Sequence, residues 1–136
     1  MKFLLDTNVF SELLKPVPSP EVLAWMEVHQ GDCGMSALTL AEMADGVESL
    51  PAGKRRNALT KALSFLQEDY AERILPFDER AAWEWARYLR EAQDAGHSPP
   101  LLDSLIAATA RTWGLKLVSR NEADFPLIEV LNPFES

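Results

Sequence analysis

The chain has 136 residues, of which 47% are hydrophobic and 25% are charged. This length and balance predict one globular domain over residues 1–136 and exclude a disordered chain. The formal net charge of −8 excludes a broadly basic surface for nucleic acid, so binding of a polyanion would require a local site. Acids gathered around a divalent cation are one such site, because the bound ion reverses the local potential.

The N-terminal segment and the cysteine count predict a cytoplasmic protein. The apolar run before Asp6 is too short for a signal peptide or a membrane span. Cys33 is the single cysteine, so the sequence supports neither an internal disulfide nor a thiolate zinc site. We expect Cys33 to be a small buried residue in a strand.

Short apolar runs alternate with longer segments of helical period along the first half of the chain. Caps and breakers delimit them, such as Ser19 before Pro20 and the segment Pro51 to Gly53. The expected elements are a strand at Lys2–Leu5, a helix capped by Asn8 and reaching Leu14, a helix from Ser19 to about His29, a strand at Cys33–Ser36 and a helix with apolar positions from Leu40 to Val47.

The second half continues the alternation. Its expected elements are a helix from Lys54 to Tyr70, a strand at Ile74–Leu75, a helix capped by Asp78 and closed by Gly96, a helix opened by Ser98 and reaching Trp113, a strand from Leu115 to Ser119 and a last strand near Val130. The pattern predicts an α/β fold with a central parallel sheet of four or five short strands, flanked by helices on both faces.

Two acids follow the first two predicted strands. Asp6 follows the first strand directly, at the edge of a parallel sheet where ligands bind, although it could merely help to cap the next helix. Glu42 lies near the same edge, just after the second strand. It also fits a capping box with Thr39, in which its side chain would serve only the helix start.

Asp103 is the single charge between Leu101 and Ala110, in a segment of apolar and small residues. A charge in a largely buried helix is costly unless it is paired or bound to a metal. The structural alternative is an acid favoured by the helix dipole, but Ser98 is expected to hold the cap position already. We therefore favour a functional role for Asp103.

The segment after the strand that ends at Ser119 supplies further polar residues. Asp124 is a candidate for a fourth acid, with Glu122 as a competitor, while Asn121 could instead form a local turn or cap with Asp124. Arg120 is placed to touch a phosphate. Carboxylates without histidine or cysteine are ligands suited to Mg²⁺ or Mn²⁺, ions that activate water for phosphodiester hydrolysis.

Four segments together resemble the PIN-domain proteins of the VapC toxin family, in its FitB-like branch. They are Leu4 to Val9, Ser36 to Glu42, Asp103 to Ala110 and Ser119 to Phe125, in the order of the family's motifs. The resemblance covers essentially the whole chain. Ser119 stands where threonine is more usual, and Pro99 to Leu102 replaces residues that are often small or polar.

The resemblance implies a Mg²⁺- or Mn²⁺-dependent endoribonuclease. Its metal-binding and catalytic acids would be Asp6, Glu42, Asp103 and Asp124, with Thr7, Asn8 and Asn121 in support. It further implies a homodimer, a VapB-like antitoxin and operator DNA bound only through that antitoxin.

Two alternatives to the nuclease remain open from the sequence. A PIN-like scaffold could act mainly in an antitoxin–DNA repressor complex. A haloacid dehalogenase-like phosphatase would use Asp6 as its nucleophile, although Asn8 stands where a second Asp is expected.

Overall fold

A parallel sheet of five short strands forms the centre of the computed structural model, which describes residues 1–135. The strand order is β3-β2-β1-β4-β5, and every neighbouring pair is parallel. The strands are β1 (Phe3–Leu5), β2 (Cys33–Ser36), β3 (Ile74–Leu75), β4 (Lys116–Val118) and β5 (Val130–Leu131). The predicted fold class is confirmed.

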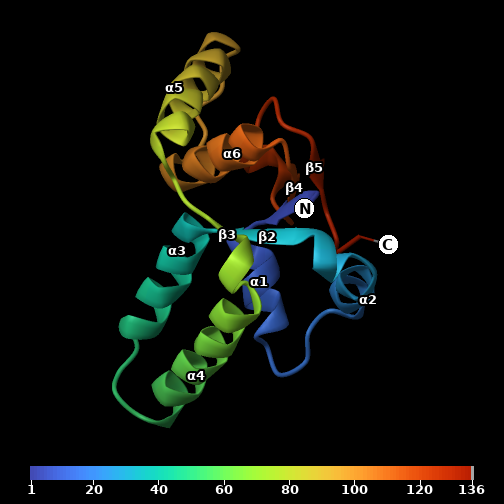
Figure 1. Ribbon diagram of the computed structural model, residues 1–136, viewed down its shortest axis with the longest axis vertical. Coiled ribbons are helices and arrows are strands. Elements are labelled where there is room, and N and C mark those ends of the chain that lie inside the picture. The colour runs from blue at the N-terminus through green and yellow to red at the C-terminus, as the bar shows by residue number, and fades with distance from the viewer. Residues whose placement is uncertain (136) are drawn as a thin grey trace.

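Helices cover both faces of this sheet (Figure 1). One face carries α1 (Thr7–Leu13), α2 (Pro20–His29), α3 (Ala37–Glu48) and α4 (Lys54–Asp69), and the other carries α5 (Glu79–Asp94) and α6 (Leu101–Trp113). The described residues also contain three short 3-10 helices, η1 (Gln30–Asp32), η2 (Ala71–Arg73) and η3 (Glu122–Asp124). No helix within residues 1–135 has the length and apolar character needed to cross a membrane.

Alternation along β1 divides the core into two layers. Leu5 points to the layer formed with α1 to α4, whereas Leu4 points to the layer formed with α5 and α6. Ala107 and Ala110 of α6 are fully buried in this second layer, and their small size lets α6 approach the sheet closely. Cys33 is buried in β2 as expected, and burial raises the pKa of its thiol to about 12, which keeps it unreactive.

Two predicted helix starts are wrong. Asp6, not Asn8, caps α1, because its carboxylate accepts a hydrogen bond from the Thr7 backbone N–H at 2.8 Å. Likewise, α6 follows Pro100, without a side-chain cap, and Ser98 lies outside the helix. A proline is tolerated there because the first helical N–H groups have no intrahelical partner. The later start of α6 places Asp103 in its first turn.

Candidate active site

The carboxyl ends of three adjacent strands meet at one edge of the sheet. Asp6 follows β1, and its neighbours in register are Ser36 at the end of β2 and Ser119 after β4. The chain proceeds from β1 to one side through β2 and β3, then returns to the other side with β4. Ligands bind at such a reversal of strand order.

Asp6 is held rigidly at this edge. It is 5% exposed, and its Oδ2 accepts hydrogen bonds from Ser119 Oγ at 2.8 Å and from Asn8 Nδ2 at 3.2 Å. Burial raises the pKa of Asp6, while the hydrogen bonds from Ser119 and the Thr7 backbone counteract part of that rise. The cap and the site placement proposed for Asp6 are therefore compatible, since one carboxylate oxygen caps α1 and the other faces Ser119.

Glu42 lies opposite Asp6 on α3. The capping box predicted as the structural alternative does not form, because Ser36 caps α3 through a hydrogen bond from the Leu38 backbone N–H. The Glu42 side chain instead accepts a hydrogen bond from Thr7 Oγ1. This contact ties α3 to the start of α1 and brings an exposed carboxylate toward the sheet edge.

Asp103 reaches the same edge from the other layer. Because α6 leads through Gly114 into β4, its first turn lies beside the carboxyl ends of the strands. The pKa of Asp103 is raised to about 6, first by burial and then by the charges of Asp6, Asp124 and Glu42. The position in the first turn, which favours an acid, is thus outweighed by burial and by repulsion from neighbouring carboxylates.

The segment after β4 contributes one supporting residue and one more distant acid. The Asn121 backbone N–H donates to Ser119 Oγ at 3.0 Å, which ties this segment to the partner of Asp6. Asp124 lies on η3, and its charge raises the pKa of both Asp6 and Asp103. The competing Glu122 is exposed.

A cavity of about 350 Å³ opens at this edge, and we call it the acidic pocket. Every predicted site residue except Asp124 lines it. Its lining consists of Asp6, Thr7, Asn8, Ser11, Glu12, Lys15, Glu42, Asp103, Arg120 and Asn121.

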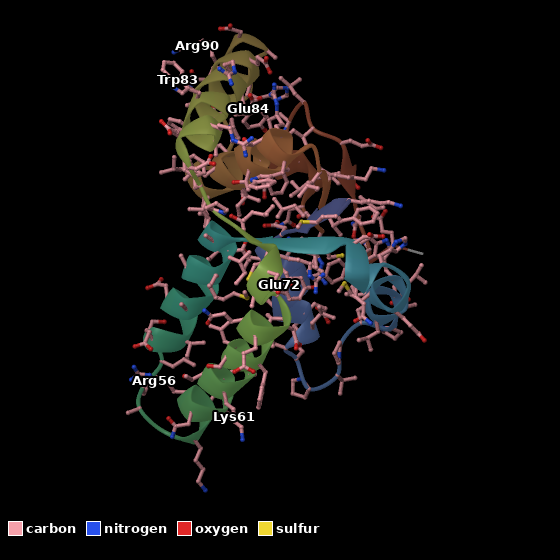
Figure 2. The ribbon with its side chains drawn as sticks, viewed as in Figure 1. Arg56, Lys61, Glu72, Trp83, Glu84 and Arg90 are labelled. Carbon is pink, nitrogen blue, oxygen red and sulfur yellow. The ribbon has the colours of Figure 1, made fainter. Side chains whose placement is uncertain are left out.

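Two basic residues on other helices, Arg56 and Arg90, are not part of the lining of this pocket. Figure 2 shows Arg56 on α4 and Arg90 on α5 at distant ends of the molecule. Arg56 is instead paired with Glu48, with 2.8 Å between Nη2 and Oε2. Arg120, the residue predicted to contact a phosphate, lies in the pocket's lining.

The sequence interpretation missed several contributors, among them Ser119, Glu12 and Lys15. Ser119 was treated only as a departure from the family, yet its hydroxyl contacts Asp6, Asn8 and the Asn121 backbone. Glu12 and Lys15 also line the pocket. Glu12 lies four residues after Asn8 on α1, a spacing that places both on one face of the helix and could have identified Glu12.

The acids do not enclose a ready-made metal site. Within residues 1–135, no three Asp, Glu, His or Cys side chains are arranged so that they could hold a metal ion by themselves. An ion in the pocket would complete its coordination with water or substrate oxygens, as Mg²⁺ commonly does when only one or two carboxylates bind it.

Fold and pocket together define a class of protein, an α/β domain with an acidic site at the carboxyl edge of a parallel sheet. A model of the PIN domain family matches residues 3–130. "VapC ribonuclease Y4jK" of Sinorhizobium fredii is 36% identical over 97% of this chain and 97% of its own length. "Toxin FitB" of Neisseria gonorrhoeae is 38% identical over 96% and 97%, respectively.

The similarity extends to solved structures. "Crystal Structure of FitAcB from Neisseria gonorrhoeae" matches with a TM-score of 0.92 and 38% identity, covering 98% of this chain and 99% of that chain. "Structure of FitAB bound to IR36 DNA fragment" also gives a TM-score of 0.92, with 37% identity and coverage of 98% and 96%. The chain belongs to the PIN-domain family, in the branch that contains the VapC and FitB toxins.

Proposed function

We propose that this chain is a metal-dependent endoribonuclease and the toxin of a toxin–antitoxin pair. The observation that carries the proposal is the convergence of Asp6, Glu42 and Asp103, from three different elements, on one pocket in a PIN-domain chain. The names of its relatives include VapC ribonucleases and a tRNA(fMet)-specific endonuclease, which supports RNA as the substrate class.

The donor chemistry of the pocket fits Mg²⁺ or Mn²⁺. Its acidic side chains are all carboxylates, and the pKa of Asp103 is raised first by burial and then by neighbouring negative charges, whose repulsion a cation would relieve. Asp6 and Asp103 would hold the ion. Asp124 on η3 is the third proposed ligand. When bound, such an ion supplies an activated water and neutralises charge on the phosphate.

The chain's own residues then orient the reaction. Ser119 and Asn8 fix the Asp6 carboxylate, and Thr7 directs Glu42 toward the pocket. Glu42 is exposed to solvent, so its carboxylate can reach an attacking water and accept a proton from it. Asn121 supports the site through its backbone bond to Ser119.

An antitoxin of the VapB type is the partner we propose. The solved neighbours named above are FitA–FitB complexes, one of them bound to a DNA fragment. By analogy, contact with operator DNA would pass through the antitoxin rather than through this acidic chain, whose net charge is −8. A homodimer, expected from the family resemblance, stays a prediction.

The test is a cleavage assay on the full chain purified free of its partner. Structured RNA, unstructured RNA and single-stranded DNA are incubated with Mg²⁺, with Mn²⁺ and with EDTA. We expect RNA cleavage that needs the divalent ion and is lost in Asp103→Asn, because an amide has nearly the same shape as the carboxylate but cannot neutralise a cation.

A matched control is Asp94→Asn at the end of α5, which changes an exposed acid outside the pocket. It should cleave like the parent chain. Equal cleavage by Asp103→Asn, or cleavage that survives EDTA, contradicts the metal-dependent mechanism. No cleavage above the Asp103→Asn background favours the scaffold role instead.

A further inference from the structure

A buried glutamate lies beside the acidic pocket without belonging to its group of predicted metal ligands. Glu12 of α1 is 6% exposed, and its carboxylate accepts hydrogen bonds from Lys15 Nζ at 2.9 Å and from the Ser19 backbone N–H at 2.9 Å. Arg120 Nη2 lies 3.6 Å from Glu12 Oε1. A carboxylate removed from water is costly unless it is paired, and here one carboxylate gathers two cations.

Both cations remain open to solvent at the pocket. The Lys15 side chain is 57% exposed and that of Arg120 is 51% exposed, and both residues line the acidic pocket. An ammonium carries three N–H donors and a guanidinium five, so each retains donors beyond its contact with Glu12. These two cations can therefore bind a further anion.

Arg120 is held from several sides. Its backbone N–H donates to Asn8 Oδ1 at 3.2 Å, and its guanidinium lies over the Phe134 ring, 3.8 Å from the centroid. Asn8 also donates to Asp6, so the backbone of Arg120 is linked to the predicted catalytic carboxylate. Little conformational freedom is left to lose when an anion binds, which favours affinity.

The three side chains together carry a net charge of about +1 beside acids that repel RNA. We propose that Glu12 is a positioning residue that holds Lys15 and Arg120 at the rim of the acidic pocket, where both cations bind phosphate groups of the RNA next to the cleaved bond. The proposal rests on the ribonuclease function proposed above and adds how an acidic chain binds its polyanionic substrate.

A purely structural role for Glu12 accounts for only some of its contacts. The Ser19 contact of Glu12 ties α1 to the start of α2, and this accounts for the burial of its carboxylate. It does not require two half-exposed cations from distant parts of the chain, Lys15 and Arg120, to converge on the same oxygen.

The first test measures RNA binding without cleavage. A fluorescein-labelled single-stranded RNA is titrated with the full chain carrying Asp103→Asn, in Mg²⁺ and at several KCl concentrations, and Kd is read from fluorescence anisotropy. Adding Lys15→Ala or Arg120→Ala should each raise Kd about tenfold. Each should also reduce the slope of log Kd against log salt by about 0.7, since one phosphate contact is lost.

Matched controls are Lys61→Ala on α4 and Arg90→Ala on α5, both exposed and away from the pocket (Figure 2). They remove the same charges and should leave Kd within about twofold. If Lys15→Ala and Arg120→Ala behave like these controls, the inference is overturned. It is also overturned if the Asp103→Asn chain binds no RNA.

The second test concerns Glu12 itself. Here the expected change in Kd is opposite in sign to the change that the loss of a negative charge alone would cause. Glu12→Gln removes a negative charge, which by itself would tighten RNA binding, but we expect Kd to rise several-fold because the cations lose their common partner. The exposed Glu72→Gln is the control (Figure 2). The effect of Arg120→Ala should shrink in the Glu12→Gln background, whereas a merely structural Glu12 would leave the two effects additive.

The two proposals fail separately. If the wild-type chain cleaves RNA but Lys15→Ala and Arg120→Ala leave Kd unchanged, phosphate binding by these two cations is contradicted and the ribonuclease function still stands. If the wild-type chain does not cleave RNA but those variants bind RNA more weakly, phosphate binding by the two cations is supported and the ribonuclease function is contradicted. If Glu12→Gln does not fold by circular dichroism, the two cation variants decide.

Discussion

Two groups of acids in this molecule have opposite electrostatic surroundings. Between α5 and α6, Arg111 pairs with Glu84 at 2.9 Å and with Glu91 at 2.8 Å, and the hydrogen bond from Arg111 lowers the pKa of Glu91. In the acidic pocket, by contrast, the pKa of Asp6 and Asp103 is raised. Glu84 and Glu91 are thus compensated within the fold, whereas burial and neighbouring carboxylates disfavour the ionised forms of Asp6 and Asp103.

The contrast teaches how to separate structural from functional acids. An acid whose charge is matched by a cation in the same chain needs no ligand to balance that charge, although an exposed pair stabilises the fold only weakly. Acids that raise one another's pKa are retained at a cost to stability, and such groups are typical of functional sites.

The largest expected effect is on catalysis. Asp6→Asn should lower the rate of RNA cleavage by about 10³-fold, within the range for loss of one catalytic group, because the amide cannot balance a cation. Glu84→Gln, on the compensated side, should cleave RNA at the parent rate. Initial rates on a fluorescent RNA measure both. Similar losses in the two variants would remove the functional distinction between the groups.

A smaller loss is expected when the support of Asp6 is removed. Ser119→Ala deletes the hydroxyl that donates to Asp6 Oδ2 and should lower activity about 10- to 100-fold, as other outer partners of metal ligands do. Ser119→Thr keeps the hydroxyl and should retain most activity. Rates at several Mg²⁺ concentrations should show a weaker ion affinity for Ser119→Ala. Equal activity of the alanine and threonine variants would contradict this role.

Acidification should act on the pocket before it acts on the ion pairs. With a pKa of about 6, Asp103 is mostly ionised at pH 7 and about nine-tenths protonated at pH 5, so cleavage at limiting Mg²⁺ should fall about tenfold between these values. Saturating Mg²⁺ should shift the midpoint to lower pH, since it binds the ionised form. A pH–rate profile that stays flat down to pH 5 at limiting Mg²⁺ would argue against Asp103 as a ligand.

The smallest expected effects are on stability, and they have opposite signs. Because the folded pKa of Asp103 is raised from 3.8 to about 6, the folded state binds the proton more tightly than the unfolded state, and stability is lost as pH rises from about 3.8 through 6. Asp103→Asn should therefore raise the free energy of unfolding at pH 7.5 in EDTA by about 1–2 kcal/mol.

The compensated side should respond in the other direction. Arg111→Ala leaves Glu84 and Glu91 without their shared partner and should lower the free energy of unfolding by about 1–2 kcal/mol. Urea denaturation of both variants beside the parent chain measures the two changes. Added Mg²⁺ should stabilise the parent and not Asp103→Asn; equal stabilisation would place the ion elsewhere.

Most of the fold was predictable because its signals are local. The strands at Ile74–Leu75 and Cys33–Ser36 and the helix ended by Gly114 follow from short apolar runs, helical periodicity and a left-handed glycine. The helix starts were less predictable. Asn8 and Ser98 are residue types that favour helix N-caps, yet Asp6 and Pro100 occupy the N-cap positions. The position of a cap depends on where the preceding strand or loop ends.

The sequence by itself determined the order of elements and which acids follow strands, because parallel strands bring their carboxyl ends to one edge whatever the details of packing. Only the tertiary structure decided the long-range partners: Thr7 with Glu42, Ser119 with Asp6, and Arg120 with Glu12. Asp6 and Ser119 are separated by 113 residues, and their contact depends on the register of β1 with β4 and the approach of α6. No local pattern encodes such a contact, since it arises from packing across the whole chain.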